Sequence, residues 1–318
     1  SREDAEKAYN ESMKTGEAVV EEFREEFENI LRPTPLRTDE LLRDLVKITG
    51  LPALKILEIA EELYAEGYIS YPRTDTNKYK LGFDYMKPLD ASCRGLGLKI
   101  EGCFNPRNGR LDDGAHTPIY PLRPYFGGGL EKTIWEYVAR RFLANGFYED
   151  SQRCFRRAVI RIGKTILKAS GSHVVNPGFY IVYPYFKPED KPIPMLKVGE
   201  KLRVVSLKLH EGSTKPPDRL TEHELLKLLE ENGIGTDATR ASFPKIILDR
   251  GYAVKDGGTF KPTELGMKLI ELLESIDERL VTPDTRRMVE ELMTMIDSGK
   301  ISYDEALDEA LRKYEELY

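Results

Sequence analysis

Apolar residues recur at helical spacing in several stretches of the chain. Residues 52–66 (PALKILEIAEELYAE) place leucine, isoleucine and alanine on one face and charged side chains on the other, which predicts an amphipathic helix. Residues 130–146 show the same period, and Thr38 and Asp39 are expected to cap a helix that follows them. A more polar helix is predicted over residues 2–14. These helices supply apolar faces around which a core can form.

The middle of the chain has the alternation and β-branched content typical of strands. Residues 152–210 contain segments such as RAVIRIG, GFYIVYPYF and EKLRVVSLKLHEG, which turns and prolines separate. Residues 17–31 fit both periods, because their apolar spacing is helical while their β-branched start favours a strand. Residues 76–114 contain several glycines and are expected to be rich in loops.

The last third of the chain returns to helical patterning. Thr221 and Glu224 form a capping box ahead of a helix, and Gly233 turns the chain. Residues 239–250 predict a second helix, and a hairpin around Gly257 precedes a third. Helix, turn, helix and hairpin in this order are the pattern of a winged helix.

Composition bounds the class of protein. The 318 residues are 40% hydrophobic and 32% charged, which suggests two or three domains and excludes global disorder. The three cysteines and four histidines show no disulfide, zinc or other metal pattern. No apolar run approaches the ~18 residues of a membrane helix. We therefore expect a soluble intracellular protein without a membrane partner.

Charge is unevenly distributed around a net value of −6. Residues 1–31 hold ten acidic and four basic residues, whereas residues 72–168 hold 18 lysines and arginines against 10 acids. Residues 151–168 contain six lysines and arginines, among them Arg156 and Arg157, and no acidic residue. A local basic face suits a polyanion. A solvated strand face is the alternative, and charge by itself does not decide between them.

The segment GYISYPRTDT (residues 67–76) carries candidate chemistry. Tyr71 lies two residues before Arg73, with Pro72 between them. A tyrosine can attack phosphorus as a covalent nucleophile, and a guanidinium can stabilise the charge that develops on phosphate oxygens. Tyr-x-Arg alone is a weak signal, because a buried tyrosine beside a surface arginine gives the same spacing.

The whole string resembles the active-site segment of type IA DNA topoisomerases, Gly-x-Ile-Ser/Thr-Tyr-x-Arg-Thr-Asp. Two further matches follow in the family's order. Residues 112–121 (DDGAHTPIYP) resemble its Ala-His-x-x-Ile-x-Pro element, and residues 233–242 (GIGTDATRAS) resemble its Gly-Ile-Gly-x-x-x-Thr element. The resemblance covers essentially all of the chain. It looks closest to the archaeal and topoisomerase III branch, with the topoisomerase part of a reverse gyrase as a neighbouring alternative.

The resemblance implies roles for individual residues. It makes Tyr71 the nucleophile, Arg73 the phosphate-stabilising cation and His116 the histidine that hydrogen-bonds near the scissile phosphate. Without the motif, His116 would be interpreted as a core histidine beside a proline turn. Tyr68 lies outside the Tyr-x-Arg position.

Further residues are candidates for contact with DNA. Two follow the nucleophile and are expected to shape its loop, two lie at a predicted helix start, and two lie on the basic segment. For the helix-start pair an ordinary cap is the alternative. The six are Thr74, Asp75, Thr239, Arg240, Arg156 and Arg157.

The resemblance also implies a multi-domain α+β fold within the toroid of a type IA topoisomerase. Residues 1–33 and 151–218 would form the first and second parts of a β-rich arch domain. Residues 34–150 would form a helical, winged-helix-like tyrosine domain that carries the nucleophile. Residues 219–318 would form a winged-helix base domain.

One departure from the family concerns the metal. Family enzymes begin with a Toprim domain, whose Glu and Asp-x-Asp carboxylates bind Mg²⁺, whereas Asp112 and Asp113 do not form an Asp-x-Asp after an apolar strand. We expect a core fragment that lacks this domain, binds no metal itself and is inactive alone. Its expected partners are single-stranded DNA and a Toprim domain, in cis or as a separate chain.

The implied activity is ATP-independent cleavage and religation of one DNA strand. In the family the tyrosine holds the 5′ phosphate while a second strand passes through the gap, which changes supercoiling. The protein would then be cytoplasmic and nucleoid-associated. The alternatives are a non-catalytic winged-helix protein that binds single-stranded DNA, and a domain that works only with a Toprim-bearing partner. A covalent 5′-phosphotyrosyl adduct separates catalysis from binding.

Overall fold

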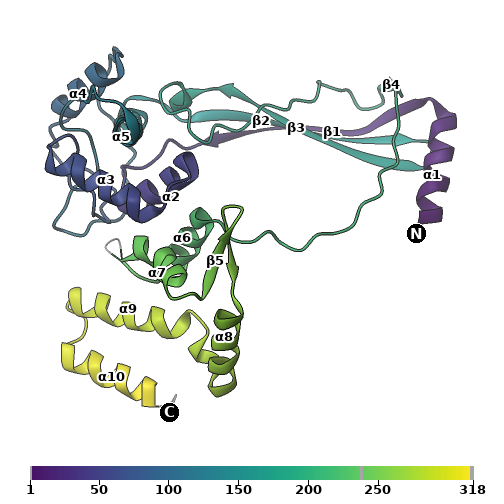
Figure 1. The fold of residues 1–318 in the computed structure, drawn as a ribbon. Helices are drawn as coiled ribbons and strands as arrows, with labels where there is room; N and C mark the ends of the chain where they lie inside the picture. Colours follow the sequence, from purple (N-terminus) through teal and green to yellow (C-terminus); the bar gives the residue numbers. More distant parts are fainter. Residues whose placement is uncertain (1, 237–238, 316–318) are drawn as a thin grey trace. The chain divides into compact units, whose positions relative to one another are not determined.

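The computed structural model describes residues 2–236 and 239–315, and the chain divides into two compact units. The strand unit comprises Ser1–Pro33, Gly102–Arg107 and Leu143–Pro216. The helical unit comprises Thr34–Glu101, Asn108–Phe142 and Pro217–Tyr318. Figure 1 shows the elements of both, and the mixture of helices and strands confirms an α+β protein.

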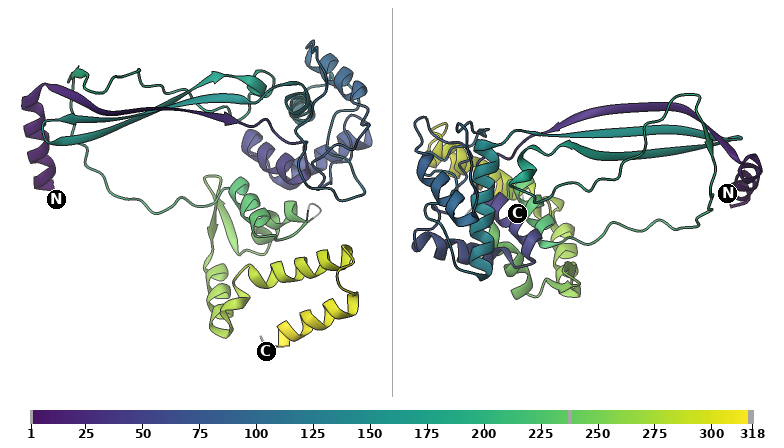
Figure 2. Two further views of the ribbon diagram at one scale, coloured as in Figure 1. Left: turned by 180° about the vertical axis from the view of Figure 1, so that it is seen from behind. Right: turned by 90° about the horizontal axis from the view of Figure 1, so that it is seen from above.

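The strand unit is built on one antiparallel sheet. Its four strands lie in the order β3-β2-β1-β4, and Figure 2 shows the three long ones as a twisted ribbon. Their bounds are β1 Glu17–Ile30, β2 Ser151–Ile162, β3 Thr165–Asn176 and β4 Lys201–Arg203. Helix α1 (Arg2–Thr15) is tied to the β2–β3 hairpin, because the Ser12 hydroxyl donates to Thr165 Oγ1 at 2.8 Å.

Strand pairing determines the conformation of residues 17–31, whose periodicity fitted both a helix and a strand. Within residues 17–31, Glu17–Ile30 form strand β1, which pairs with β2 from Val19↔Arg161 to Ile30↔Ser151. Val20 and Ala158 are buried on this sheet. A long partner strand satisfies the backbone hydrogen bonds of β1, which favours the extended form over the helical one.

One expected strand is wrong, and another is shorter than expected. Residues Gly178–Ile181 form a short 3₁₀ helix (η1) and turns follow, although the segment reads as β-branched and aromatic. Pro177 and Pro184 remove backbone donors there, so a ladder cannot continue. In the segment after Gly199, only Lys201–Arg203 joins the sheet among the described residues.

The helical unit begins with a bundle of helices. Their bounds are α2 Thr38–Thr49, α3 Ala53–Ala65, α4 Met86–Leu96 and α5 Gly129–Phe147. The expected helices over 52–66 and 130–146 are confirmed. Leu41, Ile56 and Trp135 are among the fully buried core side chains.

Residues 76–114 are rich in loops, as expected, and the helix within them is α4. Glycine content suggested loops, but Gly95 has a packing function: a Cβ there would lie 2.1 Å from the Trp135 ring. The missing side chain lets α4 approach α5 closely. Glycine in this helix therefore reflects close packing and not a break in the chain.

The rest of the helical unit follows the expected order. Thr221 caps α6 through a complete capping box with Glu224. Residues 239–250, expected as one helix, divide into a 3₁₀ turn and a short α-helix. The elements are α6 Glu222–Glu231, η2 Arg240–Ser242, α7 Phe243–Asp249, β5 Ala253–Asp256, β6 Thr259–Pro262, α8 Glu264–Ile276, η3 Glu278–Leu280, α9 Asp284–Asp297 and α10 Tyr303–Glu315. The hairpin β5–β6 is confirmed, while the winged-helix and domain assignments stay predictions.

Candidate active site

The loop that carries Tyr71 lies against the segment that carries His116. The Ser70 backbone N–H donates to Tyr120 O at 2.9 Å, and the Ser70 hydroxyl donates to Pro118 O at 2.9 Å. An isolated bridge joins Ile69 to Pro121. These bonds fix the register of the two segments, so residues 45 positions apart in the sequence reach one site.

Tyr71 and His116 come together in this site. Their ring centroids lie 5.0 Å apart with an interplanar angle of 31°, and the ring of Tyr64 meets Tyr71 edge-on at 5.2 Å. Both Tyr71 and His116 are half-buried. A phenol held between two rings and still open to solvent is suited to meet a substrate phosphate.

Neighbouring tyrosines occupy different environments. Tyr68 packs edge-on against Tyr125 at 4.9 Å, and Arg123 lies 4.8 Å from the centre of its ring. Tyr79 is buried, and burial raises the pKa of its phenol far above the ordinary value. The described contact between a tyrosine ring and His116 is the one made by Tyr71.

Arg73 projects from the same loop and is anchored by α3. Its Nε lies 2.5 Å from Glu61 Oε1, and its side chain keeps 30% of its exposure. Glu61 can hold the guanidinium in one orientation while part of it faces solvent. Sequence analysis missed Glu61, because an acid on the polar face of an amphipathic helix carries no distinguishing signal.

Thr38 ties helix α2 to the Tyr71 loop. Its hydroxyl donates to Pro72 O at 2.7 Å and accepts from the Thr74 backbone N–H at 2.7 Å. The expectation that Thr38 caps the helix is wrong, because Arg37 occupies the N-cap position and Thr38 is the first helical residue. The hydroxyl is therefore used by the loop and not by its own helix.

Thr74 is fully buried inside this loop. Its hydroxyl accepts from the Thr76 backbone N–H at 3.0 Å and lies 3.3 Å from Asp113 Oδ2. Its side chain thus contacts protein on all sides. Asp75 is more exposed and lies 3.6 Å from a guanidinium nitrogen of Arg37.

Asp113 lies between Thr74 and His116. Oδ1 accepts from the backbone N–H groups of Ala115 and His116 at 3.0 and 2.8 Å, and Oδ2 lies 3.0 Å from His116 Nδ1. Partial burial opposes ionisation, but these hydrogen bonds from His116 and from residues beside it outweigh burial and hold the pKa of Asp113 far below its ordinary value. Asp113 is a second site residue whose position sequence analysis did not assign.

The Gly-Ile-Gly motif is tied to helix α2 by a buried ion pair. Arg240 is 7% exposed, pairs with Asp39, and donates from Nε to Ile234 O at 3.1 Å. Its charge is thus engaged inside the protein. Thr239 is exposed, and its hydroxyl accepts from the Thr236 backbone N–H at 2.9 Å. Residues 237–238 of the motif lie outside the described residues.

Arg156 and Arg157 belong to strand β2 of the strand unit and face opposite sides of the sheet. Arg156 is 19% exposed, with Nε 2.7 Å from Glu25 Oε2. Arg157 is 67% exposed and lies directly opposite Arg24 of β1. Arg157 also pairs with Glu26 at 3.9 Å, and because both side chains are exposed this pair neutralises its charge only weakly.

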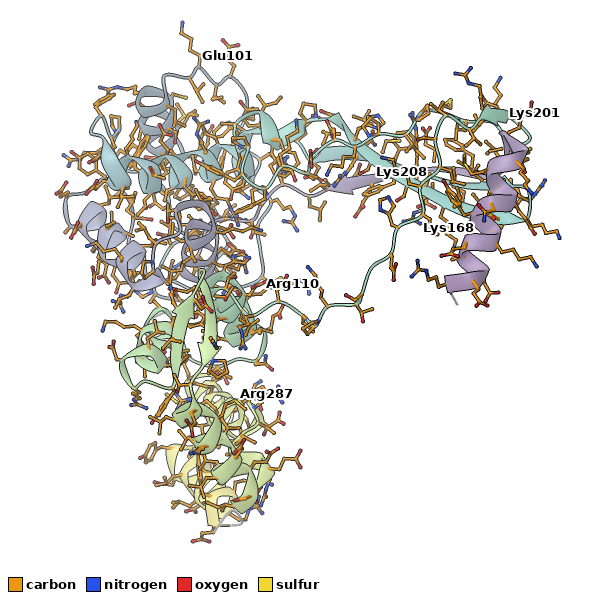
Figure 3. All side chains as sticks on the ribbon, turned by 45° about the vertical axis from the view of Figure 1, so that its right-hand side comes forward. Glu101, Arg110, Lys168, Lys201, Lys208 and Arg287 are labelled. Atoms are coloured by element: carbon orange, nitrogen blue, oxygen red, sulfur yellow. The ribbon has the colours of Figure 1, made fainter. Side chains whose placement is uncertain are left out.

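The positions of the carboxylates decide whether this chain could hold a metal ion. Within residues 2–236 and 239–315, no group of three histidine, cysteine, aspartate or glutamate side chains could hold a metal ion. Asp112 pairs with Lys78 at 3.0 Å, Asp113 is engaged as described, and Glu101 is exposed and projects outward from its loop (Figure 3). These residues do not fit a Mg²⁺ site, which needs several oxygen ligands in octahedral geometry. Among the described helices, none is long and apolar enough to cross a membrane.

Comparison with known proteins agrees with the motifs. A family model described as DNA topoisomerase matches residues 1–308. The chain is 35% identical over 322 residues to DNA topoisomerase 3-beta-1 of Homo sapiens, covering 98% of this chain and 37% of that protein. It is 34% identical over 319 residues to DNA topoisomerase 1 of Archaeoglobus fulgidus, covering 98% and 47%.

A solved structure has the same fold. Full-length topoisomerase I from Thermotoga maritima matches with a TM-score of 0.79 and 25% identity, over 98% of this chain and 54% of that one. The chain thus spans about half or less of the proteins it resembles. The match of the family model over nearly the whole chain, together with these relatives, shows that it belongs to the type IA DNA topoisomerases.

Proposed function

We propose that this chain supplies the nucleophile and part of the phosphate-binding machinery of an ATP-independent enzyme that cleaves, passes and rejoins DNA strands. The observation that carries the proposal is the half-buried Tyr71, held against His116 and followed by the anchored Arg73. The chain spans only part of its relatives, so the complete reaction is proposed for the enzyme of which these residues are the core.

The proposed step is a transesterification. The Tyr71 oxygen forms a bond to phosphorus and loses its proton, while the bond from phosphorus to the 3′ oxygen breaks and that oxygen gains a proton. The product is a 5′-phosphotyrosine and a free 3′ hydroxyl. Attack by this hydroxyl reverses the step. One phosphoester replaces another throughout, so no ATP is needed.

Arg73 and His116 would assist this step from two separate segments of the chain. The guanidinium of Arg73 would stabilise charge that develops on the non-bridging phosphate oxygens. His116 lies beside the phenol and can exchange a proton or hydrogen-bond to the phosphate. Thr74, Asp75, Thr239 and Arg240 would guide the strand, Thr74 and Arg240 through the backbone they hold, because both side chains are buried.

The domain assignment belongs to the same proposal. The strand unit would be the arch, and the helical unit would combine the tyrosine domain with a winged-helix base. Type IA topoisomerases are in general Mg²⁺-dependent, and a bound Mg²⁺ would supply charge stabilisation at the phosphate. Because the described residues of this chain do not fit that ion, we propose that a Toprim domain, in cis or as a separate chain, holds it. The enzyme would act on single-stranded DNA and associate with the nucleoid.

The test places these 318 residues in a chimera, in place of the matching segment of the Archaeoglobus fulgidus enzyme. The chimera is incubated with a labelled single-stranded oligonucleotide and Mg²⁺, denatured, and assayed for covalent adduct. We expect Tyr71→Phe to abolish adduct formation, because the phenyl ring has no oxygen that could bond to phosphorus. Binding of the oligonucleotide should change little, since phosphate contacts and base stacking are kept.

Tyr68→Phe is the matched control. It removes the same atom from a phenol three residues away that packs on Tyr125, and the adduct should form at the parental rate. Mass spectrometry of the adduct should identify the modified peptide as the one containing Tyr71. An adduct retained by Tyr71→Phe would refute the assignment, and binding without any adduct in the parental chimera would favour a non-catalytic DNA-binding protein.

A further inference from the structure

The hydrogen bonds around Asp113 assign separate tasks to its two oxygens. Oδ1 accepts two backbone N–H groups, from Ala115 and His116. Oδ2 faces the His116 Nδ1 atom at 3.0 Å and the Thr74 hydroxyl at 3.3 Å. The Asp113 backbone N–H in turn donates to Thr76 Oγ1 at 3.0 Å. The carboxylate is therefore fixed in the loop from both its backbone and its side chain.

A carboxylate fixed in this way controls which imidazole nitrogen carries the proton. An ionised carboxylate can only accept hydrogen bonds, so the Nδ1 atom that faces it must be the donor. The hydrogen bond made by one ring nitrogen determines the state of the other. Neutral His116 then carries its proton on Nδ1 and keeps a lone pair on Nε2.

We propose that Asp113 is a positioning residue, which holds His116 as the Nδ1–H tautomer and makes Nε2 the only nitrogen that exchanges a proton beside Tyr71. In the neutral ring Nε2 accepts a proton, and in the imidazolium it donates one. The role for catalysis rests on the proposed function, whereas the tautomer itself follows from this site alone. Asp113 touches no reacting atom and acts through His116.

The substitution Asp113→Asn should change which nitrogen of His116 carries the proton. The two backbone N–H groups can only donate, so they keep the amide oxygen of the asparagine in the Oδ1 position. Its NH₂ group then faces His116 Nδ1 and can only donate, which forces Nδ1 to accept. The variant therefore inverts the tautomer, and the proton moves to Nε2. The substitution is isosteric and keeps the loop's backbone bonds.

The experiment is nitrogen NMR of the 318-residue chain labelled with ¹⁵N-histidine, recorded at a pH of about 8.5, above the ordinary histidine pKa of ~6.5. The chain has four histidines, and His116→Gln assigns the signal that disappears. We expect His116 to show a protonated Nδ1 in the wild type and a protonated Nε2 in Asp113→Asn. Asp112→Asn, which removes a neighbouring carboxylate that pairs with Lys78, should resemble the wild type.

Each outcome decides a separate point. A wild-type His116 protonated on Nε2, or no inversion in Asp113→Asn, overturns the proposal whatever the enzyme does. In the chimera, Asp113→Asn should lower adduct formation by about 10²-fold, the usual contribution of a placed acid–base group, with DNA binding unchanged. Inversion without loss of cleavage overturns the role for catalysis. Cleavage that survives Tyr71→Phe refutes the proposed function and leaves the tautomer result intact.

Discussion

Surroundings, more than residue type, distinguish the tyrosines near the site. Tyr64 and Tyr71 form one edge-on pair, yet only Tyr71 also meets a histidine among the described contacts. Tyr68 is engaged by Tyr125 and Arg123, and burial keeps Tyr79 protonated. A nucleophile needs access and a nearby proton acceptor, and Tyr71 combines the two.

The first residue-scale prediction concerns Arg73. Arg73→Ala in the chimera should slow adduct formation by about 10²–10³-fold, because a charge preorganised at the developing phosphate anion is lost. Binding of single-stranded DNA should fall much less. Rates are measured with a labelled oligonucleotide under single-turnover conditions.

Arg94→Ala is the matched control for charge. Arg94 is an exposed arginine of α4 whose described ion pair is with Asp90 in the same helix. Its removal should leave the cleavage rate unchanged. Equal effects of the two substitutions would mean that net charge, and not the position of Arg73, sets the rate.

The second residue-scale prediction concerns acid stability. The pKa of Asp113 is lower in the folded chain than in the unfolded one, so the unfolded state binds the extra proton. Its contribution is present above an unfolded pKa of ~3.9 and is lost as pH falls further toward the folded value. The free energy of unfolding of wild type minus that of Asp113→Asn should therefore shrink as pH falls below ~4.

Urea unfolding at several pH values measures this difference. The single tryptophan, Trp135, is buried in the helical unit and reports on its unfolding. Asp112→Asn serves again as the control for removing one carboxylate. A difference that grows toward low pH would contradict the sign of the shift.

At the scale of elements, periodic segments were predictable from sequence and isolated polar contacts were not. The helix within residues 52–66 was predictable because its apolar residues lie on one face, and that face is buried in the core. Pairing with β2 determines that segment 17–31 is a strand, and two prolines determine that residues 178–186 are not. The first outcome depends on a hydrogen-bond partner far away in the sequence and the second on the positions of nearby prolines, and the periodicity of apolar residues contains neither.

The site shows the same division. The motifs led to Tyr71, Arg73 and His116, and the structure brings Tyr71 and His116 into contact. Glu61 holds Arg73 through a hydrogen bond from helix α3, whose placement only the fold supplies, whereas Asp113 holds His116 from three residues earlier in the same segment. Supporting residues of this kind lack a spacing rule, so sequence analysis could not assign them.

The element-scale prediction concerns the connection between α2 and the Tyr71 loop. Thr38→Val should lower the free energy of unfolding of the helical unit by about 1–3 kcal/mol, because the buried Thr74 N–H loses its acceptor and Pro72 O loses its donor. Urea unfolding followed by Trp135 fluorescence should show a lower midpoint with an unchanged slope.

Thr133→Val is the matched control for this change. Thr133 lies in helix α5, and its hydroxyl makes one exposed bond of 3.3 Å to Gly129 O. Both substitutions replace a hydroxyl by a methyl group in a helix, yet the control should stay within about 0.5 kcal/mol of wild type. A similar small effect for Thr38→Val would show that the loop does not depend on this hydroxyl.

At the scale of the whole molecule, structure changes the meaning of the charge distribution. Strand β1 carries six glutamates and one arginine, and it lies beside β2, which carries four arginines and no acid. Glu25 pairs with Arg156 and Glu21 with Arg161, so much of the basic segment is neutralised by its neighbour. Lys168 and Lys201 project from the same sheet (Figure 3). Cations available to a polyanion are therefore fewer than the sequence suggests. Arg157 is one of them, because its pair with Glu26 is longer, at 3.9 Å, and exposed to solvent.

The last prediction uses the two adjacent arginines of β2 as a matched pair. Each phosphate contact on a single strand contributes about −0.7 to the slope of log affinity against log salt. Arg157→Gln removes an exposed charge whose 3.9 Å pair with Glu26 is open to solvent and therefore weak, so it should lower affinity for a labelled oligonucleotide and make the slope shallower by about 0.7. Arg156→Gln removes an equal charge that Glu25 already neutralises on the other face, so the slope should not change. Fluorescence anisotropy between about 50 and 200 mM salt measures both variants against wild type, a range over which phosphate contacts change affinity strongly. A shallower slope for Arg156→Gln than for Arg157→Gln would place the DNA on the opposite face of the sheet, and wild-type slopes for both would remove this sheet from the path of the strand.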